Sequence, residues 1–242
     1  MSWAAHQFEG YIAQRHFGKH VAISYLAIVV GDQAPDFITK YWVYGIDLGF
    51  AKFGTSNPAQ FHRGWPGAGF THSLLFGVVL AGIVYAFTRN QAWFVGMVIG
   101  TSLHVLTDIT DTAGTLVLFP LSTENITIGM WKYGAAGGRY RDAAAYYSSL
   151  GFVMDAAWFV IALFNWRVLT ERYFRTVVRP ADPVWGWLGR RMPDIALLAL
   201  YRAMFFYAGC RVVAWVTWAH AVEHYPWDLR WGGPSFVEGI NL

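Results

Sequence analysis

Four long runs of apolar residues divide the chain. They cover residues 72–88, 92–110, 148–168 and 194–219. Each is close to the length of about 20 residues that an α-helix needs to cross a hydrocarbon core of about 30 Å. The pattern predicts an all-α membrane protein, a helical bundle with about four transmembrane spans.

The residues before the first of these runs predict shorter helices. Residues 20–34 stay apolar for only about a dozen positions before Gly31 and Asp32 interrupt them, which suits a half-spanning helix. Residues 3–17 mix aromatic and polar side chains and predict an interfacial helix. Stretches 41–53, 54–71 and 111–147 are expected to be interfacial or loop segments. We expect residues 1–242 to form one integral membrane domain.

The composition supports a membrane protein and excludes other classes. Hydrophobic residues make up 55% of the 242 positions and charged residues 14%, roughly half the charged fraction of soluble proteins. That charge cannot cover the surface of a soluble globule, and the apolar content is too high for a disordered chain. The net charge of +3 is too small to indicate nucleic acid as a partner. Cys210, the single cysteine, lies in an apolar run and is expected to be buried.

The arginines indicate how the chain is oriented in the membrane. Residues 167–193 contain six arginines, and Arg89 lies in the short turn after the first apolar run. With four spans, these two segments lie on one side, which the positive-inside rule makes cytoplasmic. Residues 54–71, 111–147 and the C-terminal tail then lie on the other side.

Ionisable residues gather near the non-cytoplasmic ends of the predicted spans, where charged groups are costly and usually functional. His104 and Asp108 are four residues apart and share one helix face, where an imidazole and a carboxylate can bind one divalent ion. With Asp36 and His72 they offer two nitrogen and two oxygen ligands, a set that suits zinc. Alternatively, His104 and Asp108 only form a hydrogen bond inside the bundle.

Several motifs in this region follow one another along the chain: PDF at 35–37, HRG at 62–64, THSL at 71–74 and LHVLTDITDTAGTLVLFP at 103–120. In these motifs the chain resembles the YdjM-like group of membrane-bound metal-dependent hydrolases, bacterial inner-membrane proteins distantly similar to zinc-dependent phospholipase C and S1/P1-type nucleases. Ile38 and Thr39 stand where that group has an aspartate and a histidine. The resemblance covers residues 1–125, and residues 126–242 are expected to add two spans and an aromatic tail.

The resemblance implies a centre of one to three divalent metal ions, most simply zinc. Asp36, His72, His104 and Asp108 match the ligands of the first metal, and Asp108 is placed to bridge to a second. In the phospholipase-like enzymes, the aspartate that matches Asp36 is also the favoured base that deprotonates the attacking water.

The resemblance also implies an N-terminal histidine ligand, for which His6 and His20 are candidates. His20 starts the helix that leads to Asp36, so a straight helix would place the two about 20 Å apart. His6 starts the preceding helix, and a hairpin that turns near Gly18 would return it beside Asp36. Geometry therefore favours His6.

Other polar residues near this end allow two interpretations each. His62 and Arg63 would bind metal and a substrate phosphate, respectively, or Arg63 would only anchor an ordered loop. Asp111 is a possible further ligand. The HAVEH segment, with His220, Glu223 and His224, would bind a second metal or only mark a polar helix end.

Two further patterns concern the spans themselves. Asp155 and Arg211 lie at similar depths in the third and fourth spans and predict a buried ion pair between them. Four tryptophans near the C-terminus predict an aromatic belt at the membrane interface: Trp215, Trp218, Trp227 and Trp231.

The sequence favours a membrane hydrolase that acts on a phosphoester or ester by metal-activated water. A site at headgroup depth favours a lipid-like or lipid-linked substrate on the non-cytoplasmic face. The alternative is a non-catalytic membrane subunit that keeps the fold and packs against other membrane proteins. Membrane lipids are expected partners, and a membrane-protein partner or a homo-oligomer is possible.

Overall fold

The bundle is built from helices and one short hairpin in the residues that the computed structural model describes, 2–133 and 138–232. The longer helices are α1 (Trp3–Phe17), α2 (Tyr25–Tyr44), α4 (Leu74–Thr88), α5 (Gln91–Asp108), α7 (Leu150–Phe164) and α11 (Asp194–Thr217). Shorter helical elements are α3 (Pro58–Arg63), η1 (Gly69–His72), α6 (Gly138–Tyr147), η3 (Trp166–Leu169), α8 (Glu171–Tyr173), η4 (Phe174–Val178), α9 (Arg179–Ala181), α10 (Pro183–Leu188) and η5 (Trp218–Val222). In the hairpin, β1 (Ile46–Asp47) pairs antiparallel with β2 (Lys52–Phe53). The prediction of a helical protein is confirmed.

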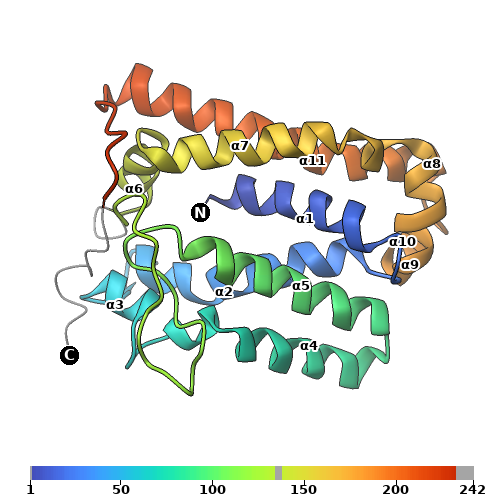
Figure 1. Cartoon of the computed structure of the whole chain (residues 1–242), viewed down its shortest axis with the longest axis horizontal. Helices are drawn as coiled ribbons and strands as arrows, with labels where there is room; N and C mark the ends of the chain where they lie inside the picture. Colours follow the sequence, from blue (N-terminus) through green and yellow to red (C-terminus); the bar gives the residue numbers. More distant parts are fainter. Residues whose placement is uncertain (1, 134–137, 233–242) are drawn as a thin grey trace.

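Helix α1 lies inside the bundle, with α7 and α11 on one side and α2 and α5 on the other (Figure 1). The Ser2 hydroxyl caps its start by accepting hydrogen bonds from the two amides of residues 4 and 5. Phe8 and Tyr11 pack into an apolar core with side chains of α11, and His6 and Glu9 are also buried. The bounds of this helix match the sequence prediction, but its mixed pattern reflects two buried faces and not a surface helix.

Helix α2 is longer than the sequence predicts. It begins after its cap Ser24 and continues for 20 residues through Asp32 and Pro35. Proline cannot bond to the carbonyl four residues before it, but the Thr101 hydroxyl of α5 donates to that carbonyl, on Gly31, at 3.0 Å. Because a neighbouring helix satisfies the freed acceptor, the helix continues through Asp32 and beyond residue 34, where the predicted stretch ends.

The four predicted spans correspond to α4, α5, α7 and α11. Among the described residues, one continuous helix, Asp194–Val222, is long and apolar enough to cross a membrane by length and composition. Helices α4 and α7 are apolar but have 15 residues each, which gives them a length of about 22 Å. The structure therefore confirms the helical bundle but not a bundle of four full spans.

The outward faces of these helices are apolar. Phe87 on α4, Phe164 on α7 and Phe206 on α11 are 85%, 83% and 61% exposed. A surface with many exposed large apolar side chains fits contact with lipid. Cys210 also lies at the exposed face of α11 and is not buried as predicted.

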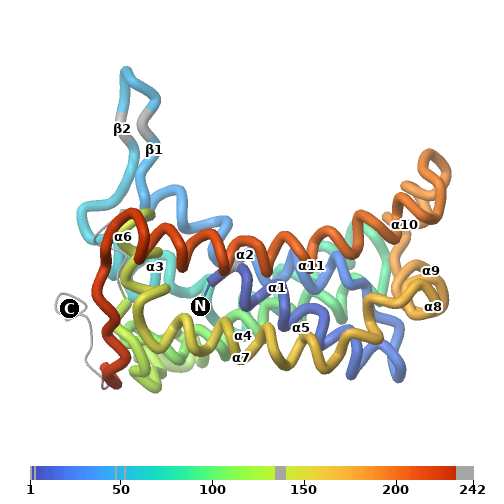
Figure 2. Tube along the Cα trace, turned by 90° about the horizontal axis from the view of Figure 1, so that it is seen from above, coloured from blue at the N-terminus to red at the C-terminus, as the bar shows by residue number. Residues whose placement is uncertain are grey.

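The two ends of the bundle carry different elements (Figure 1). The arginine-rich segment with α8, α9 and α10 forms one end. The hairpin β1–β2, α3, α6 and the loop after α5 lie at the other, and Figure 2 shows the hairpin projecting from the bundle there. Of the predicted tail, Trp227 and Trp231 are exposed, and residues 233–242 lie outside the described residues, as do 134–137 of the predicted loop.

Candidate metal centre

Helices α2 and α5 approach so closely that their polar faces meet. A Cβ atom on Gly100 would collide with the carbonyl oxygen of Ile28, and one on Gly31 would lie 2.5 Å from the carbonyl oxygen of Met97. Only glycine allows this backbone distance. Residues at four-residue intervals share one helix face. Because α2 and α5 touch at positions 28 and 100, positions 32 and 36 of α2 and 104 and 108 of α5 lie on the faces that the two helices turn towards each other.

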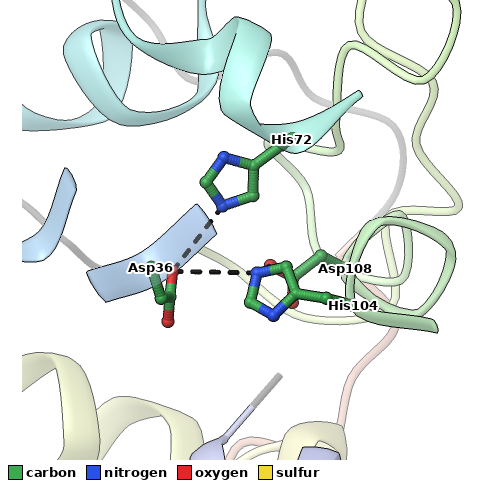
Figure 3. A group of neighbouring side chains, drawn as sticks. All are labelled: Asp36, His72, His104 and Asp108. Carbon is green, nitrogen blue, oxygen red and sulfur yellow. Dashed lines mark ion pairs between the residues drawn. The ribbon is translucent and has the colours of Figure 1, made fainter. Parts of the chain in front are cut away.

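Asp36 lies at the centre of three histidines. Its Oδ1 atom is 3.3 Å from His62 Nε2, 3.6 Å from His72 Nε2 and 3.8 Å from His104 Nε2. These side chains come from α2, α3, the end of η1 and α5, and all are buried. Figure 3 shows His72 and His104 pointing at the Asp36 carboxylate.

Asp108 completes the cluster beside His104. Its Oδ2 atom lies 3.3 Å from His104 Nε2. Asp36, His72, His104 and Asp108 each offer one ligand atom, and these atoms lie within 4.8 Å of one another. The structure thus brings together the four residues that the sequence suggests as ligands of one ion.

A second group of potential metal ligands lies on the side of the cluster that faces α1. His6, Asp32 and His104 also offer atoms within 4.8 Å of one another. His6 Nδ1 lies 3.2 Å from Asp32 Oδ1, and the His6 ring stacks on that of His104 with centroids 4.3 Å apart. His20 is exposed. The structure therefore places His6, and not His20, in the cluster, as the hairpin argument predicts.

Sequence reasoning missed two acidic residues, one in this second group and one beside it. Asp32 precedes Asp36 by four residues, and Glu9 follows His6 by three; Glu9 Oε2 lies 3.4 Å from His6 Nδ1. Both spacings place the acid on the same helix face as a predicted ligand. That periodicity is the signal that would have identified them.

The donor set fits a divalent cation. The Nε2 atoms of His6, His72 and His104 are buried and have no hydrogen-bond partner among the described residues. Buried polar atoms nearly always make hydrogen bonds, so three ring nitrogens that face carboxylates without a well-formed hydrogen bond need an explanation. A metal ion bound by imidazole and carboxylate groups, as zinc is, provides one.

Asp36 carries the negative charge that such a cation requires. Burial would raise the pKa of its carboxyl group, but Lys40, His62 and His72 hold that pKa well below its ordinary value. Lys40 Nζ lies 3.7 Å from Asp36 Oδ2. Asp36 is therefore ionised at neutral pH.

Arg63 is buried and anchored by two carboxylates. Its Nη2 atom lies 2.5 Å from Asp108 Oδ2 and 3.5 Å from Asp111 Oδ2. Burial opposes its charge, but the two carboxylates raise the pKa of the guanidinium above its ordinary value. Asp111 in turn accepts hydrogen bonds from the backbone amides of Ala113 and Gly114. Arg63 thus anchors the loop after α5, and Asp111 belongs to that loop contact and to neither metal-binding group.

A cavity of about 530 Å³ adjoins the cluster. Of the four cluster residues Asp36 forms part of its wall, together with Arg63 and Asp111, so the cluster meets the cavity at the Asp36 carboxylate. Several further side chains of the wall are basic or aromatic: Lys40, Lys132, Arg211, Phe37, Tyr41, Tyr44, Trp131, Tyr133, Tyr146, Tyr147 and Trp215. The cavity can therefore accept a molecule with both an anionic and an apolar part.

The HAVEH segment does not join the cluster. The His220 ring stacks on Trp227 with centroids 3.9 Å apart, and Glu223 and His224 are exposed. None of the three belongs to a group of described residues that could hold a metal. The structure places η5, which contains the first residues of this segment, against α6 and the end of α11, outside the cluster.

The structure gives Asp155 partners other than Arg211, with which the sequence predicts an ion pair. Asp155 accepts hydrogen bonds from the hydroxyls of Ser2, Tyr146 and Tyr147. Arg211 lines the cavity, with its guanidinium 5.7 Å from the centre of the Tyr207 ring. The carboxylate is satisfied by the start of α1 and by α6, which the hydropathy pattern could not place beside α7.

Fold and site together define a class: a helical bundle with an apolar outer surface, whose buried histidine and aspartate groups could hold a metal ion. Comparison with protein families is consistent with this class. A model of the family described as YdjM inner membrane protein matches residues 4–221, and the chain belongs to this family. The match continues past residue 125, where the motif resemblance ends, into the second half. No curated protein and no solved structure matches the chain.

Proposed function

We propose that this protein is a membrane-embedded, metal-dependent hydrolase, similar to phospholipase C, that acts on a lipid-like or lipid-linked phosphoester. The buried cluster of Asp36, His72, His104 and Asp108, at the edge of a cavity of about 530 Å³, carries the proposal. Ligand-type side chains converge there beside a space that a substrate can enter. Such a combination is typical of a catalytic and not a structural metal site.

The side chains have distinct roles in this proposal. The four cluster residues hold the first ion, and His6 with Asp32 provides for a second. A divalent cation, most simply zinc, would supply Lewis acidity for activating water and polarising a phosphoryl oxygen. Asp36 accepts the proton of the attacking water, because it is ionised and faces both the ligands and the cavity.

The charge of the cavity wall favours a phosphoester over a neutral ester. Four basic side chains line it, Lys40, Arg63, Lys132 and Arg211, beside three carboxylates, Asp36, Asp111 and Asp142, so the basic side chains outnumber the acidic ones. Guanidinium and ammonium groups bind phosphate oxygens by charge-assisted hydrogen bonds. We infer that these residues orient the phosphoryl group towards the metal-ligand cluster.

The outer edge of the cavity favours a lipid-like substrate. Phe37 and Tyr41 line the cavity and are 60% and 52% exposed at the surface. A headgroup in the cavity would leave its apolar chain against these rings and the adjacent lipid. The site lies at the opposite end from the arginine-rich segment (Figure 1), and we therefore propose that it faces the non-cytoplasmic side.

Hydrolysis by the purified chain in detergent tests the proposal. With zinc, the wild type should hydrolyse a chromogenic phosphodiester or a short-chain phospholipid, and a chelator should abolish this activity. Asp36→Asn should lower the rate by about 10²–10⁴-fold, the usual contribution of a general base, and leave the protein folded. Asp228→Asn, at an exposed carboxylate paired with Arg230, should retain full activity.

Absence of metal-dependent turnover across a panel of phosphoesters and acyl esters would contradict the hydrolase. In that case, a membrane protein that co-purifies with the chain would favour the non-catalytic subunit.

A further inference from the structure

Two threonines contact the histidines that face Asp36. Thr39 Oγ1 lies 2.7 Å from His62 Nδ1, and Thr71 Oγ1 lies 3.0 Å from His72 Nδ1. The other nitrogen of each ring, Nε2, faces the same oxygen atom of Asp36. The same arrangement of hydroxyl, ring and carboxylate therefore occurs twice, with threonines from α2 and η1.

The protons of these contacts can be assigned from the partners of each hydroxyl. Thr39 Oγ1 donates to the carbonyl of Pro35 at 2.9 Å, and Thr71 Oγ1 donates to the carbonyl of Ala68 at 2.8 Å. A hydroxyl has one proton, and a carbonyl oxygen can only accept. Each hydroxyl must then accept from its histidine, so Nδ1 carries the ring proton and Nε2 carries a lone pair.

The opposite assignment leaves a contact of each hydroxyl unsatisfied. If a threonine donated to Nδ1, its oxygen would face a carbonyl oxygen with no proton between them. The ring protons would then sit on Nε2 and share one oxygen of Asp36 at 3.3 Å and 3.6 Å, without a well-formed hydrogen bond. The first assignment satisfies both contacts of each hydroxyl and is favoured at both positions.

We propose that His62 is a ligand of the metal centre, and that Thr39 and Thr71 are positioning residues that aim the Nε2 lone pairs of His62 and His72 at the cation. This inference rests on the metal centre of the proposed function. The distances of 3.3 Å and 3.6 Å from Asp36 Oδ1 to the two Nε2 atoms each fit a pair of neighbouring metal ligands. His72 belongs to the four-residue group, whereas His62 lies outside both groups and adjoins the centre through Asp36. Tetrahedral bonds of about 2.0–2.1 Å place neighbouring ligands about 3.3 Å apart.

Zinc binding to the metal-free full-length protein in detergent tests this inference without measuring turnover. His62→Ala should lower zinc affinity at least tenfold. Thr39→Val and Thr71→Val should each lower it about 10–100-fold, the usual effect of losing a group that orients a ligand. Thr39→Ser and Thr71→Ser should retain the zinc affinity of the wild type, because serine keeps the hydroxyl.

The matched control is a threonine whose hydroxyl also donates to a backbone carbonyl but lies away from the histidines of the site. Thr176 Oγ1 donates to the carbonyl of Arg172 at 2.8 Å, and Thr176→Val should bind zinc as the wild type does. Thermal melting of each metal-free variant reports whether it folds. Should a valine variant fail to fold, ¹⁵N NMR of the wild type decides, with a proton expected on Nδ1 of both rings.

The outcomes separate this inference from the hydrolase proposal. Unchanged zinc affinity in His62→Ala would overturn the ligand assignment. Unchanged affinity in both valine variants, or protons on Nε2, would overturn the role of the threonines. A wild type that binds zinc but hydrolyses nothing would contradict the hydrolase alone, and a wild type that binds no zinc would overturn both.

Discussion

Among single residues, Arg63 has the strongest influence on the electrostatics of the site. Its guanidinium is buried between Asp108 and Asp111 and lies 5.3 Å from the centre of the Tyr133 ring. In the metal-free protein the guanidinium contacts the Asp108 carboxylate directly. A bound metal ion would add a second positive charge beside the same carboxylate, so the importance of Arg63 for stability should depend on the metal.

Arg63→Ala should lower the free energy of unfolding of the metal-free protein by about 3–5 kcal/mol, because it removes the guanidinium that contacts the buried carboxylates of Asp108 and Asp111. The loss should be smaller with zinc bound. Detergent-induced unfolding with and without zinc measures both values. Arg175→Ala removes a half-exposed pair with Glu171 and should change stability little. An equal loss with and without zinc would show that no metal neutralises Asp108.

At the scale of elements, the contact between α2 and α5 determines whether the site can form. Glycines at 31 and 100 let the two backbones touch, and Asp36 and His104 follow within about one turn on the two helices. Any side chain at position 100 would push the helices apart and would separate Asp36 from His104.

Gly100→Ala should therefore lower the free energy of unfolding by about 1–3 kcal/mol, the usual cost of overpacking, and weaken zinc binding as well. Gly82→Ala is the matched change in α4, where a Cβ atom would meet nothing within 4 Å; it should leave zinc binding unchanged and stability equal or slightly higher. Wild-type zinc affinity in Gly100→Ala would show that the site does not depend on this close approach.

The sequence predicts most helices because their patterns are local. Bounds near 74–88, 91–108 and 194–217 follow from apolar runs, whereas the extension of α2 past Pro35 depends on Thr101, which belongs to another helix. Likewise, His104 and Asp108 are predicted by their spacing. The partners of Asp155 and the isolation of HAVEH depend on the position of α1 and α6, which no local pattern specifies.

For the whole molecule, the metal-ligand cluster and the arginine-rich segment lie at opposite ends of the bundle (Figure 1). The positive-inside rule places the arginines in the cytoplasm, so the cluster should face the other side of the inner membrane. A reporter fused after Arg179 should read as cytoplasmic, and one inserted within residues 121–133 should read as external. The reverse pattern would contradict this orientation but not the identity of the ligands.

The metal content of the purified protein tests the central claim most directly. His104 belongs to both groups of described residues that could hold a metal, and its loss removes a nitrogen ligand from each. After exposure to zinc and extensive dialysis, the wild type should retain at least one zinc ion per chain. His20→Ala, at an exposed histidine outside the cluster, should retain the same amount, and His104→Ala should retain little or none. Equal zinc content in all three proteins, or none in the wild type, would contradict a metal centre formed by these residues.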